Sequence, residues 1–161
     1  MIEVYFDGCC LPRNPGGHAG SGFLIINGPN TFKGSSYIGY GAGMTNNLAE
    51  HHGANQALKK LLEWGHQDEV INFYGDSMMA IMQLSGKWGF KKGAYIPTLI
   101  ESKSLIKKFK KIGFEWIPRE ENYEADYLST LEVYRRFPQM ESRITWNIGR
   151  TFESEMAVKQ A

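Results

Sequence analysis

The first forty residues contain three segments with the pattern of β-strands before any helical pattern begins. Residues 2–7 alternate apolar side chains with polar ones and end in Asp7. A glycine-rich turn follows, and residues 22–28 (GFLIING) and 32–40 predict two further strands. Because consecutive strands joined by short turns pair antiparallel, the chain is expected to begin with a three-stranded meander.

After this meander the pattern changes to alternating helices and strands. Apolar residues at helical spacing predict a helix over 49–64 that Gly65 ends. Residues 70–75 (VINFYG) form a short, continuously apolar strand, which is typical of a buried position. Asp76 ends this strand, and Ser77 is placed to cap a short helix after it.

The remaining elements complete a mixed sheet. Pro97 fits the first turn of a helix reaching about residue 111, and residues 114–118 (FEWIP) predict the last strand. Asn122 is placed to cap a final helix that stops before Pro138. The predicted fold is therefore α/β, with a mixed five-stranded sheet, antiparallel at first and parallel afterwards, and helices on both faces.

Length and composition indicate a single globular domain. The chain has 161 residues, 42% of them hydrophobic, and every apolar run is shorter than the ~18 residues of a membrane span. The first residues lack the basic segment of a signal peptide, and the two cysteines are adjacent and poorly placed to bridge. We expect a cytoplasmic monomer with no membrane association and with reduced thiols. Residues 1–138 form the predicted domain, and 139–161 are an extension of unknown structure.

The charge is unevenly distributed, although the net charge is only +1. Residues 87–119 contain nine Lys or Arg and two acids, so the remainder of the chain is acidic. A basic block of this kind indicates an anion-binding face, for which nucleic acid is the commonest large ligand. The block is equally consistent with a solvated helix that carries lysines on its outer side.

Four acids occupy positions that suggest chemistry. Glu50 and Asp126 lie near predicted helix starts, where the helix dipole alone explains an acid. Asp7 and Asp76 end neighbouring strands, where two carboxylates would repel and lose hydration unless a cation binds between them. Carboxylate oxygens are ligands for hard divalent ions, and Mg²⁺, which keeps several waters and takes few protein carboxylates, fits better than a calcium cage or a zinc site. The four histidines lack zinc-ligand spacing.

Four motifs in order resemble the type 1 ribonuclease H family, over residues 1 to about 136. They are Asp7-Gly8 followed by Asn14-Pro15-Gly16-Gly17, Thr45-Asn46-Asn47 with Glu50 three residues on, Asp76-Ser77 after an apolar strand, and Asn122 four residues before Asp126. The run Pro-Arg-Glu-x-Asn-x-x-Ala-Asp at 118–126 is most similar to archaeal, plant-type and short phage or bacterial members, which lack the histidine that other members carry in this loop.

The resemblance implies a catalytic mechanism. In that family the four acids, here Asp7, Glu50, Asp76 and Asp126, hold two Mg²⁺ or Mn²⁺ ions that cleave the RNA strand of an RNA–DNA hybrid and leave 5′-phosphate and 3′-hydroxyl ends. Asp7 is expected to bridge both ions. One ion activates the attacking water and the other stabilises the leaving 3′ oxygen.

The resemblance also implies substrate contacts. Asn14, Asn46 and Asn47 are expected to read the minor groove and its 2′-hydroxyls, and Thr45 to bind a DNA-strand phosphate. A basic, aromatic stretch is expected to grip phosphates: Lys87, Trp88, Lys91 and Lys92. Without the resemblance, the asparagines read as a turn and a loop, and Trp88 as a core residue.

Two departures from the family pattern concern phosphate binding and catalysis. Leu48 stands where many bacterial members carry a basic residue, and the loop before the last helix has no histidine. Glu121 or Glu120 is a candidate for part of the histidine's role, with Asn122 as a further auxiliary residue. Two other functions remain open: a module of this fold that binds hybrid or double-stranded RNA without cutting it, and another two-metal nuclease of the same superfamily.

Overall fold

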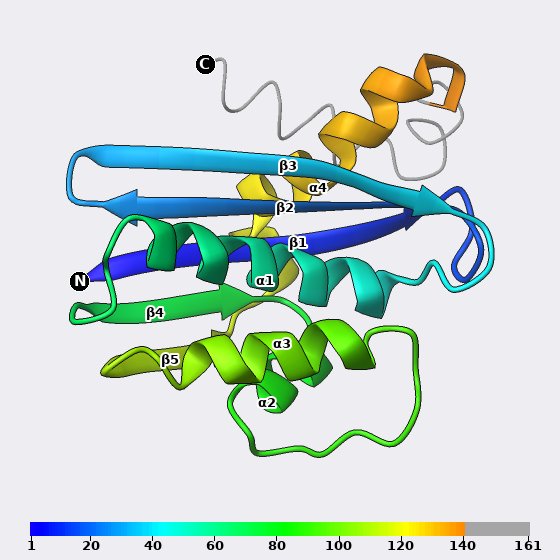
Figure 1. The fold of residues 1–161 in the computed structure, drawn as a ribbon. Coiled ribbons are helices and arrows are strands. Elements are labelled where there is room, and N and C mark those ends of the chain that lie inside the picture. The colour runs from blue at the N-terminus through cyan, green and yellow to red at the C-terminus, as the bar shows by residue number, and fades with distance from the viewer. Residues whose placement is uncertain (141–161) are drawn as a thin grey trace.

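The computed structural model describes residues 1–140 and contains one five-stranded sheet in the order β3-β2-β1-β4-β5 (Figure 1). The strands are β1 Ile2–Leu11, β2 His18–Asn27, β3 Asn30–Tyr40, β4 Val70–Gly75 and β5 Lys111–Trp116. The helices are α1 Asn46–Glu63, α2 Met78–Leu84, α3 Ile96–Ile106 and α4 Tyr123–Arg136, with a short 3₁₀ helix at Arg119–Glu121. The predicted order of elements and the mixed sheet are both confirmed.

Strand β1 is the centre of the sheet and joins its two halves. It pairs antiparallel with β2 from Ile2 to Leu11, but parallel with β4 only from Ile2 to Tyr5. The prediction that this strand ends at residue 7 was therefore wrong, because pairing with β2 continues for four more residues. Asp7 lies just beyond the last pair with β4, at the edge where that strand also ends.

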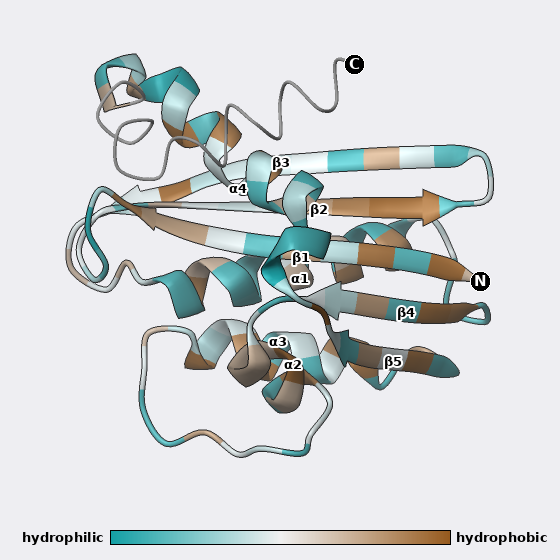
Figure 2. Ribbon diagram, turned by 180° about the vertical axis from the view of Figure 1, so that it is seen from behind, coloured by the Kyte–Doolittle hydropathy of each residue, from teal (hydrophilic) through white to brown (hydrophobic). Residues whose placement is uncertain are grey.

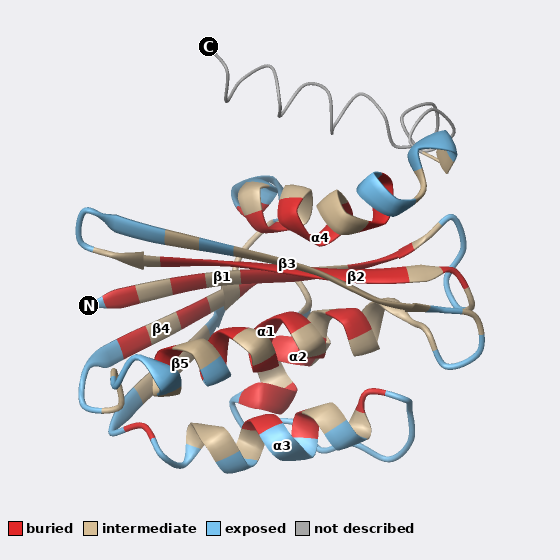
Figure 3. Cartoon of the chain, turned by 45° about the horizontal axis from the view of Figure 1, so that its top comes forward, coloured by how far each residue is buried: buried red, intermediate tan, exposed pale blue. Residues whose placement is uncertain are grey.

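The helices divide between the two faces of the sheet. Helices α1, α2 and α3 lie on one face, and α4 lies alone on the other (Figure 3). Apolar residues concentrate on β1, β2, β4 and β5, whereas the edge strand β3 is more polar (Figure 2). The main core lies under α1, where Val4, Leu58 and Phe73 are fully buried. This apolar core stabilises the sheet ends that carry Asp7 and Asp76.

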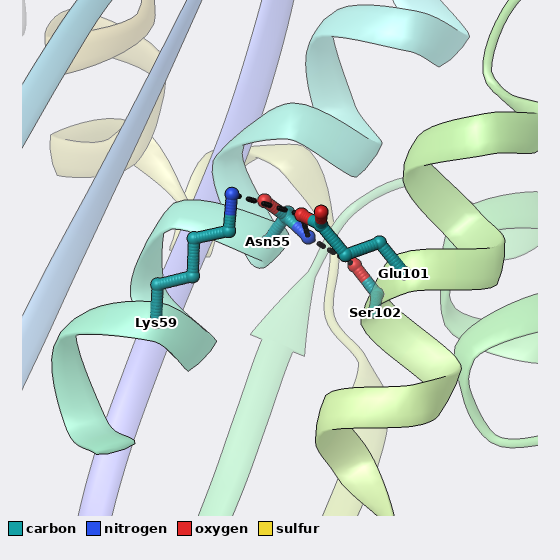
Figure 4. Close-up of polar contacts among 4 residues, drawn as sticks. All are labelled: Asn55, Lys59, Glu101 and Ser102. Carbon is teal, nitrogen blue, oxygen red and sulfur yellow. Dashed lines mark hydrogen bonds and ion pairs between the residues drawn. The ribbon is translucent and has the colours of Figure 1, made fainter. Parts of the chain in front are cut away.

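A polar contact joins α1 to α3 at the margin of this core (Figure 4). The buried Asn55 amide donates to Glu101 Oε1 at 2.9 Å and to Ser102 Oγ at 3.1 Å. Lys59 Nζ lies 2.8 Å from the same Glu101 oxygen. Because Asn55 and Ser102 are buried, these hydrogen bonds set the register of the two helices.

Several helix and strand ends follow local signals in the sequence. Ser77 Oγ accepts from Ala80 N at 3.1 Å, which confirms the predicted cap of α2, and Gly65 ends α1 at a φ of 76°. The α3 boundary was wrong: this helix ends at Ile106, not near residue 111. Lys111 pairs with Val70 instead, and so β5 begins three residues earlier than predicted. Within residues 1–140, no helix is long and apolar enough to cross a membrane.

Candidate functional site

The four acids singled out in the sequence line one pocket of about 290 Å³ between the second half of β1 and the carboxyl end of β4. Asp7 is 6% exposed on β1, and Asp76 follows β4 directly. One carboxylate oxygen from each of Asp7, Glu50 and Asp76 lies within 4.8 Å of the other two. Asp126, in the first turn of α4, reaches the same pocket from the opposite face of the sheet.

A glycine allows Glu50 to approach Asp7 this closely. A Cβ on Gly8 would lie 2.2 Å from Glu50 N and 2.3 Å from the Ala49 carbonyl carbon. Both are backbone atoms and cannot move aside, so any side chain at this position would push α1 away from β1. The Asp-Gly pair thus supplies one carboxylate and the space for the second.

Burial and mutual repulsion disfavour the charged forms of these carboxylates. Burial, followed by the charges of Asp76, Asp126 and Glu50, holds the pKa of Asp7 well above its usual range. Burial raises the pKa of Glu50 to about 7, against a hydrogen bond from Ser77 that lowers it. The pKa of Asp76 is also raised, chiefly by burial. Metal-free protein thus stores unfavourable electrostatic energy at this site.

This donor set fits a hard divalent cation. The charged oxygens of the pocket are those of its four carboxylates, and Arg119 is the single cation among its described lining residues. A divalent ion would favour the charged form of each carboxylate and remove the repulsion among them. Asp7, Glu50 and Asp76 could therefore hold such an ion, with Asp126 lining the same pocket.

Asn122 has a different role from the predicted helix cap. It is the residue before α4, but its side chain makes no capping hydrogen bond. Instead its amide nitrogen donates to the Phe6 carbonyl at 2.9 Å and to Asp76 Oδ2 at 3.1 Å. These bonds tie the start of α4 to β1 and to a pocket carboxylate, and the one to Asp76 lowers that group's pKa.

We expect Asn122→Ala to reduce activity by about 10- to 100-fold, as the loss of groups that orient metal ligands does at other sites. The free energy of unfolding should fall by about 1–3 kcal/mol, since the buried Phe6 carbonyl loses its partner. Initial rates at varied Mg²⁺ and urea denaturation measure both effects. Asn30→Ala, at an exposed position, is the control. Unchanged activity in Asn122→Ala would show that this residue does not position Asp76.

Of the three predicted groove-reading residues, Asn46 lies beside the acids and contacts Asn14. Asn46 lines the pocket, and its backbone N–H donates to Asn14 Oδ1 at 3.1 Å, so the turn after β1 and the start of α1 meet there. Thr45 Oγ1 accepts from Leu48 N at 3.0 Å and caps α1. Its hydroxyl proton is not used by this cap. Asn47, the next residue along α1, does not line the pocket.

The basic stretch forms an exposed loop outside the pocket. Trp88 is 46% exposed, so its interpretation as a core residue was wrong. Buried Gln83 anchors the loop: its amide nitrogen donates to Gly89 O at 3.4 Å and to Tyr95 Oη at 3.1 Å. Gln83 Oε1 lies 2.9 Å from His51 Nε2, on the helix that carries Glu50. These contacts connect the loop to the site.

Some pocket residues escaped the sequence analysis. Arg119, in the loop before α4, lowers the pKa of Asp76 by its charge, whereas Glu121 is exposed and lines a neighbouring hollow with Tyr5. Glu120 is exposed and outside the pocket too. Thr130 and Tyr134 line the pocket from later turns of α4. Asp126, Thr130 and Tyr134 are spaced four residues apart, so the sequence already indicated that they share one face of the helix.

Comparisons with solved structures agree with this fold. Ribonuclease H1 from the halophilic archaeon Halobacterium salinarum is 28% identical, with a TM-score of 0.69 over 80% of this chain and 94% of that one. LC11-RNase H1, solved in complex with an RNA/DNA hybrid, is 29% identical, with a TM-score of 0.70 over 80% and 93% of the two chains.

Sequence comparisons reach a longer relative and a family. The bifunctional protein Rv2228c of Mycobacterium tuberculosis is 31% identical over 85 residues, which are 53% of this chain and 23% of that protein. The chain thus matches under a quarter of this relative's length. The sequence model of the family described as "Reverse transcriptase-like" matches residues 5–131. The chain therefore belongs to this reverse transcriptase-like family, and its fold and sequence are similar to those of type 1 ribonucleases H.

Proposed function

We propose that this protein is a metal-dependent endoribonuclease that hydrolyses the RNA strand of RNA–DNA hybrids. The observation that carries the proposal is the pocket in which oxygens of Asp7, Glu50 and Asp76 lie within 4.8 Å of one another, with Asp126 beside them. Carboxylates this close and this buried are typical of sites that hold divalent ions for phosphoryl transfer. The likeness to the hybrid-bound LC11-RNase H1 supports the choice of substrate.

In this proposal, residues of the chain bind the metal ions and orient the substrate. Asp7, Glu50, Asp76 and Asp126 would hold two Mg²⁺ ions, for which Mn²⁺ could substitute. When bound, such ions activate water for in-line attack and stabilise the leaving 3′ oxygen, so the products carry 5′-phosphate and 3′-hydroxyl ends. Asn14, Asn46 and Asn47 contact the minor groove, where a 2′-hydroxyl distinguishes RNA from DNA.

Two further residues complete the proposed site. Thr45 donates its hydroxyl proton to a phosphate of the DNA strand while its oxygen caps α1. Arg119 is the cation at the pocket and offsets the charge of Asp76. A role for Glu121 in place of a loop histidine is not supported, because that side chain lines another hollow.

The domain and its setting belong to the same proposal. The end of α4 at Arg136 supports a catalytic domain over 1–138, and the predicted extension lies, from residue 141 on, outside the described residues. Cys9 and Cys10 are both free thiols, which favours a reducing, cytoplasmic setting. We propose that the domain acts as a monomer, since all four acids come from one chain.

The test uses hybrid, duplex RNA and duplex DNA of one sequence, each labelled on both strands, in EDTA, Mg²⁺ or Mn²⁺. We expect loss of the RNA strand of the hybrid only, with either metal and not in EDTA. Cleavage of duplex DNA would indicate another nuclease of the superfamily. A gel shift without cleavage in both metals would favour a binding module, which the sequence left open.

The exposed basic loop should contribute affinity and not chemistry. Replacing Lys87, Lys91 and Lys92 together by Ala should raise KM about 10-fold or more at low salt, with kcat nearly unchanged, because such lysines act through phosphate charge. The slope of log KM against log salt should fall by about one for each phosphate that the variant no longer neutralises. The matched control replaces Lys107, Lys108 and Lys110 beyond α3. An equal effect in the control would assign the effect to net charge alone.

A further inference from the structure

The pocket of acids continues along the seam between β1 and α4. Residues two apart on a strand, or four apart on a helix, share a face, so a line of side chains leads away from Asp7 and Asp126. The residues that line this continuation are Cys9 and Leu11 on β1, and Thr130 and Tyr134 on α4. The seam ends where Leu11 pairs with His18, the first residue of β2.

Four rings lie together at this end of the seam, and we call them the aromatic platform: His18, Tyr37, Tyr40 and Phe137. The His18 ring centroid is 4.4 Å from that of Tyr40 and 4.0 Å from that of Phe137. His18 Nδ1 also lies 2.8 Å from Tyr37 Oη. The carboxyl end of α4 lies over the end of β3 (Figure 1), so the platform joins three elements and its rings are held in place.

Tyr40 is the outward ring of the platform. His18, Tyr37 and Phe137 are partly buried between the sheet and α4, whereas Tyr40 is 58% exposed. Desolvation lowers the pKa of His18, so its ring supports Tyr40 as a neutral aromatic group. The guanidinium of Arg136 lies 4.8 Å from the Tyr37 ring centroid, and this side chain is exposed. The platform therefore pairs a stacking surface with a positive charge.

We propose that the aromatic platform binds an unpaired nucleotide of the RNA strand where that strand leaves the hybrid. Its base stacks on Tyr40, and an adjoining phosphate contacts Arg136. Stacking on an aromatic side chain, next to a cation for the phosphate, is the usual way in which proteins bind single strands irrespective of sequence. Bases inside a duplex are already stacked, so the ligand is an unpaired one.

The separation along the sheet fits this assignment, which rests on the proposed function. His18 pairs with Leu11, four residues beyond Asp7, and this is about 14 Å at ~3.4 Å per residue. Tyr40 pairs with His18 two strands away from β1, which adds about 10 Å across the sheet at ~4.8 Å per strand, so the stacking ring lies several nucleotides from the acids. Because the RNA strand is the one whose phosphate enters the acidic pocket, it is the strand that the seam leads to the platform.

The experiment compares three hybrids of the same short duplex: blunt, extended by unpaired RNA at its 5′ end, and extended at its 3′ end. Binding is measured by fluorescence anisotropy in EDTA, where no strand is cut. We expect one extended hybrid to bind the wild-type chain about tenfold more tightly than the blunt hybrid. Tyr40→Phe should keep this gain and Tyr40→Ala should lose it. Arg136→Gln should reduce the salt dependence of the gain by about one phosphate contact.

Trp64→Ala provides the matched control, because Trp64 is 43% exposed at the carboxyl end of α1, away from the acids. It should leave the gain unchanged. Equal binding of all three hybrids by the wild-type chain, or a gain that survives Tyr40→Ala, would overturn the platform while metal-dependent cleavage of the blunt hybrid kept the proposed function. Absence of both binding and cleavage of every hybrid would overturn the function, and the platform with it.

Discussion

Asp7→Asn is expected to abolish metal-dependent cleavage while stabilising the metal-free protein. Asp7 is the most enclosed of the pocket acids, and its carboxylate faces those of Asp76, Asp126 and Glu50. Activity should fall by more than about 100-fold, because the loss of a group that only orients a metal ligand already costs about 10- to 100-fold. The amide keeps the size of the side chain and can still accept the Gly8 N–H at 2.9 Å.

The stability change has the opposite sign to the activity change. In EDTA at pH 8, we expect the free energy of unfolding of Asp7→Asn to rise by about 1–3 kcal/mol, because a poorly compensated buried charge is removed. Mg²⁺ should then stabilise the wild type more than the variant. Asp68→Asn, the same change at an exposed position, is the control for both readouts. Retained cleavage, or a destabilised metal-free variant, would contradict the assignment of Asp7.

Glu50→Gln should stabilise the metal-free protein by an amount that grows as the pH rises. Burial raises the pKa of Glu50 from 4.5 to about 7. Below pH 4.5 the group is protonated in both states and contributes nothing. Between 4.5 and 7 the unfolded chain loses its proton first, so ionisation increasingly favours unfolding. Above pH 7 the full penalty, roughly 3 kcal/mol at ~1.4 kcal/mol per pKa unit, is present in the wild type and absent in the variant.

This difference is measured by urea denaturation of both proteins in EDTA from pH 4.5 to 8.5. Subtracting the two curves matters, because burial lowers the pKa of His18, His51 and His52. Those histidines increase stability as the pH rises toward their unfolded pKa, but they are common to both proteins and cancel. Saturating Mg²⁺ should remove the wild-type penalty. A difference that is constant with pH would show that Glu50 ionises freely in the folded protein.

Local patterns in the sequence correctly predicted those helix ends that depend on residues nearby in the sequence. Ser77 caps α2 and Gly65 ends α1 as expected, since both signals act within a few residues. The ends of β1 and β5 depend on strand partners: β1 extends to Leu11 because β2 accompanies it, and Lys111 begins β5 because it meets Val70. Such pairings link residues that are distant in the sequence, and the hydrophobic periodicity of one segment does not identify its strand partner.

The same limit applies to the site. The strand-end argument for Asp7 and Asp76 needed only the order of the elements, and the structure brings these two acids together with Glu50. Asn122 has the residue type of a helix cap, and only its proximity to Phe6 and Asp76 diverts its side chain. Arg119 lies in an ordinary polar loop in the sequence. Arg119 lines the pocket because the loop that carries it passes the end of β4, where Ile117 N donates to Gly75 O.

The position of α4 on its own face of the sheet has a consequence during protein synthesis. Residues 1–63, which form β1, β2, β3 and α1, leave the ribosome long before Asp126 does. Domains fold as units while translation proceeds at roughly 5–20 residues per second, so the helix bearing the last carboxylate is also the last to dock. A nascent or prematurely terminated chain without Asp126 thus lacks one of the four acids that line the pocket.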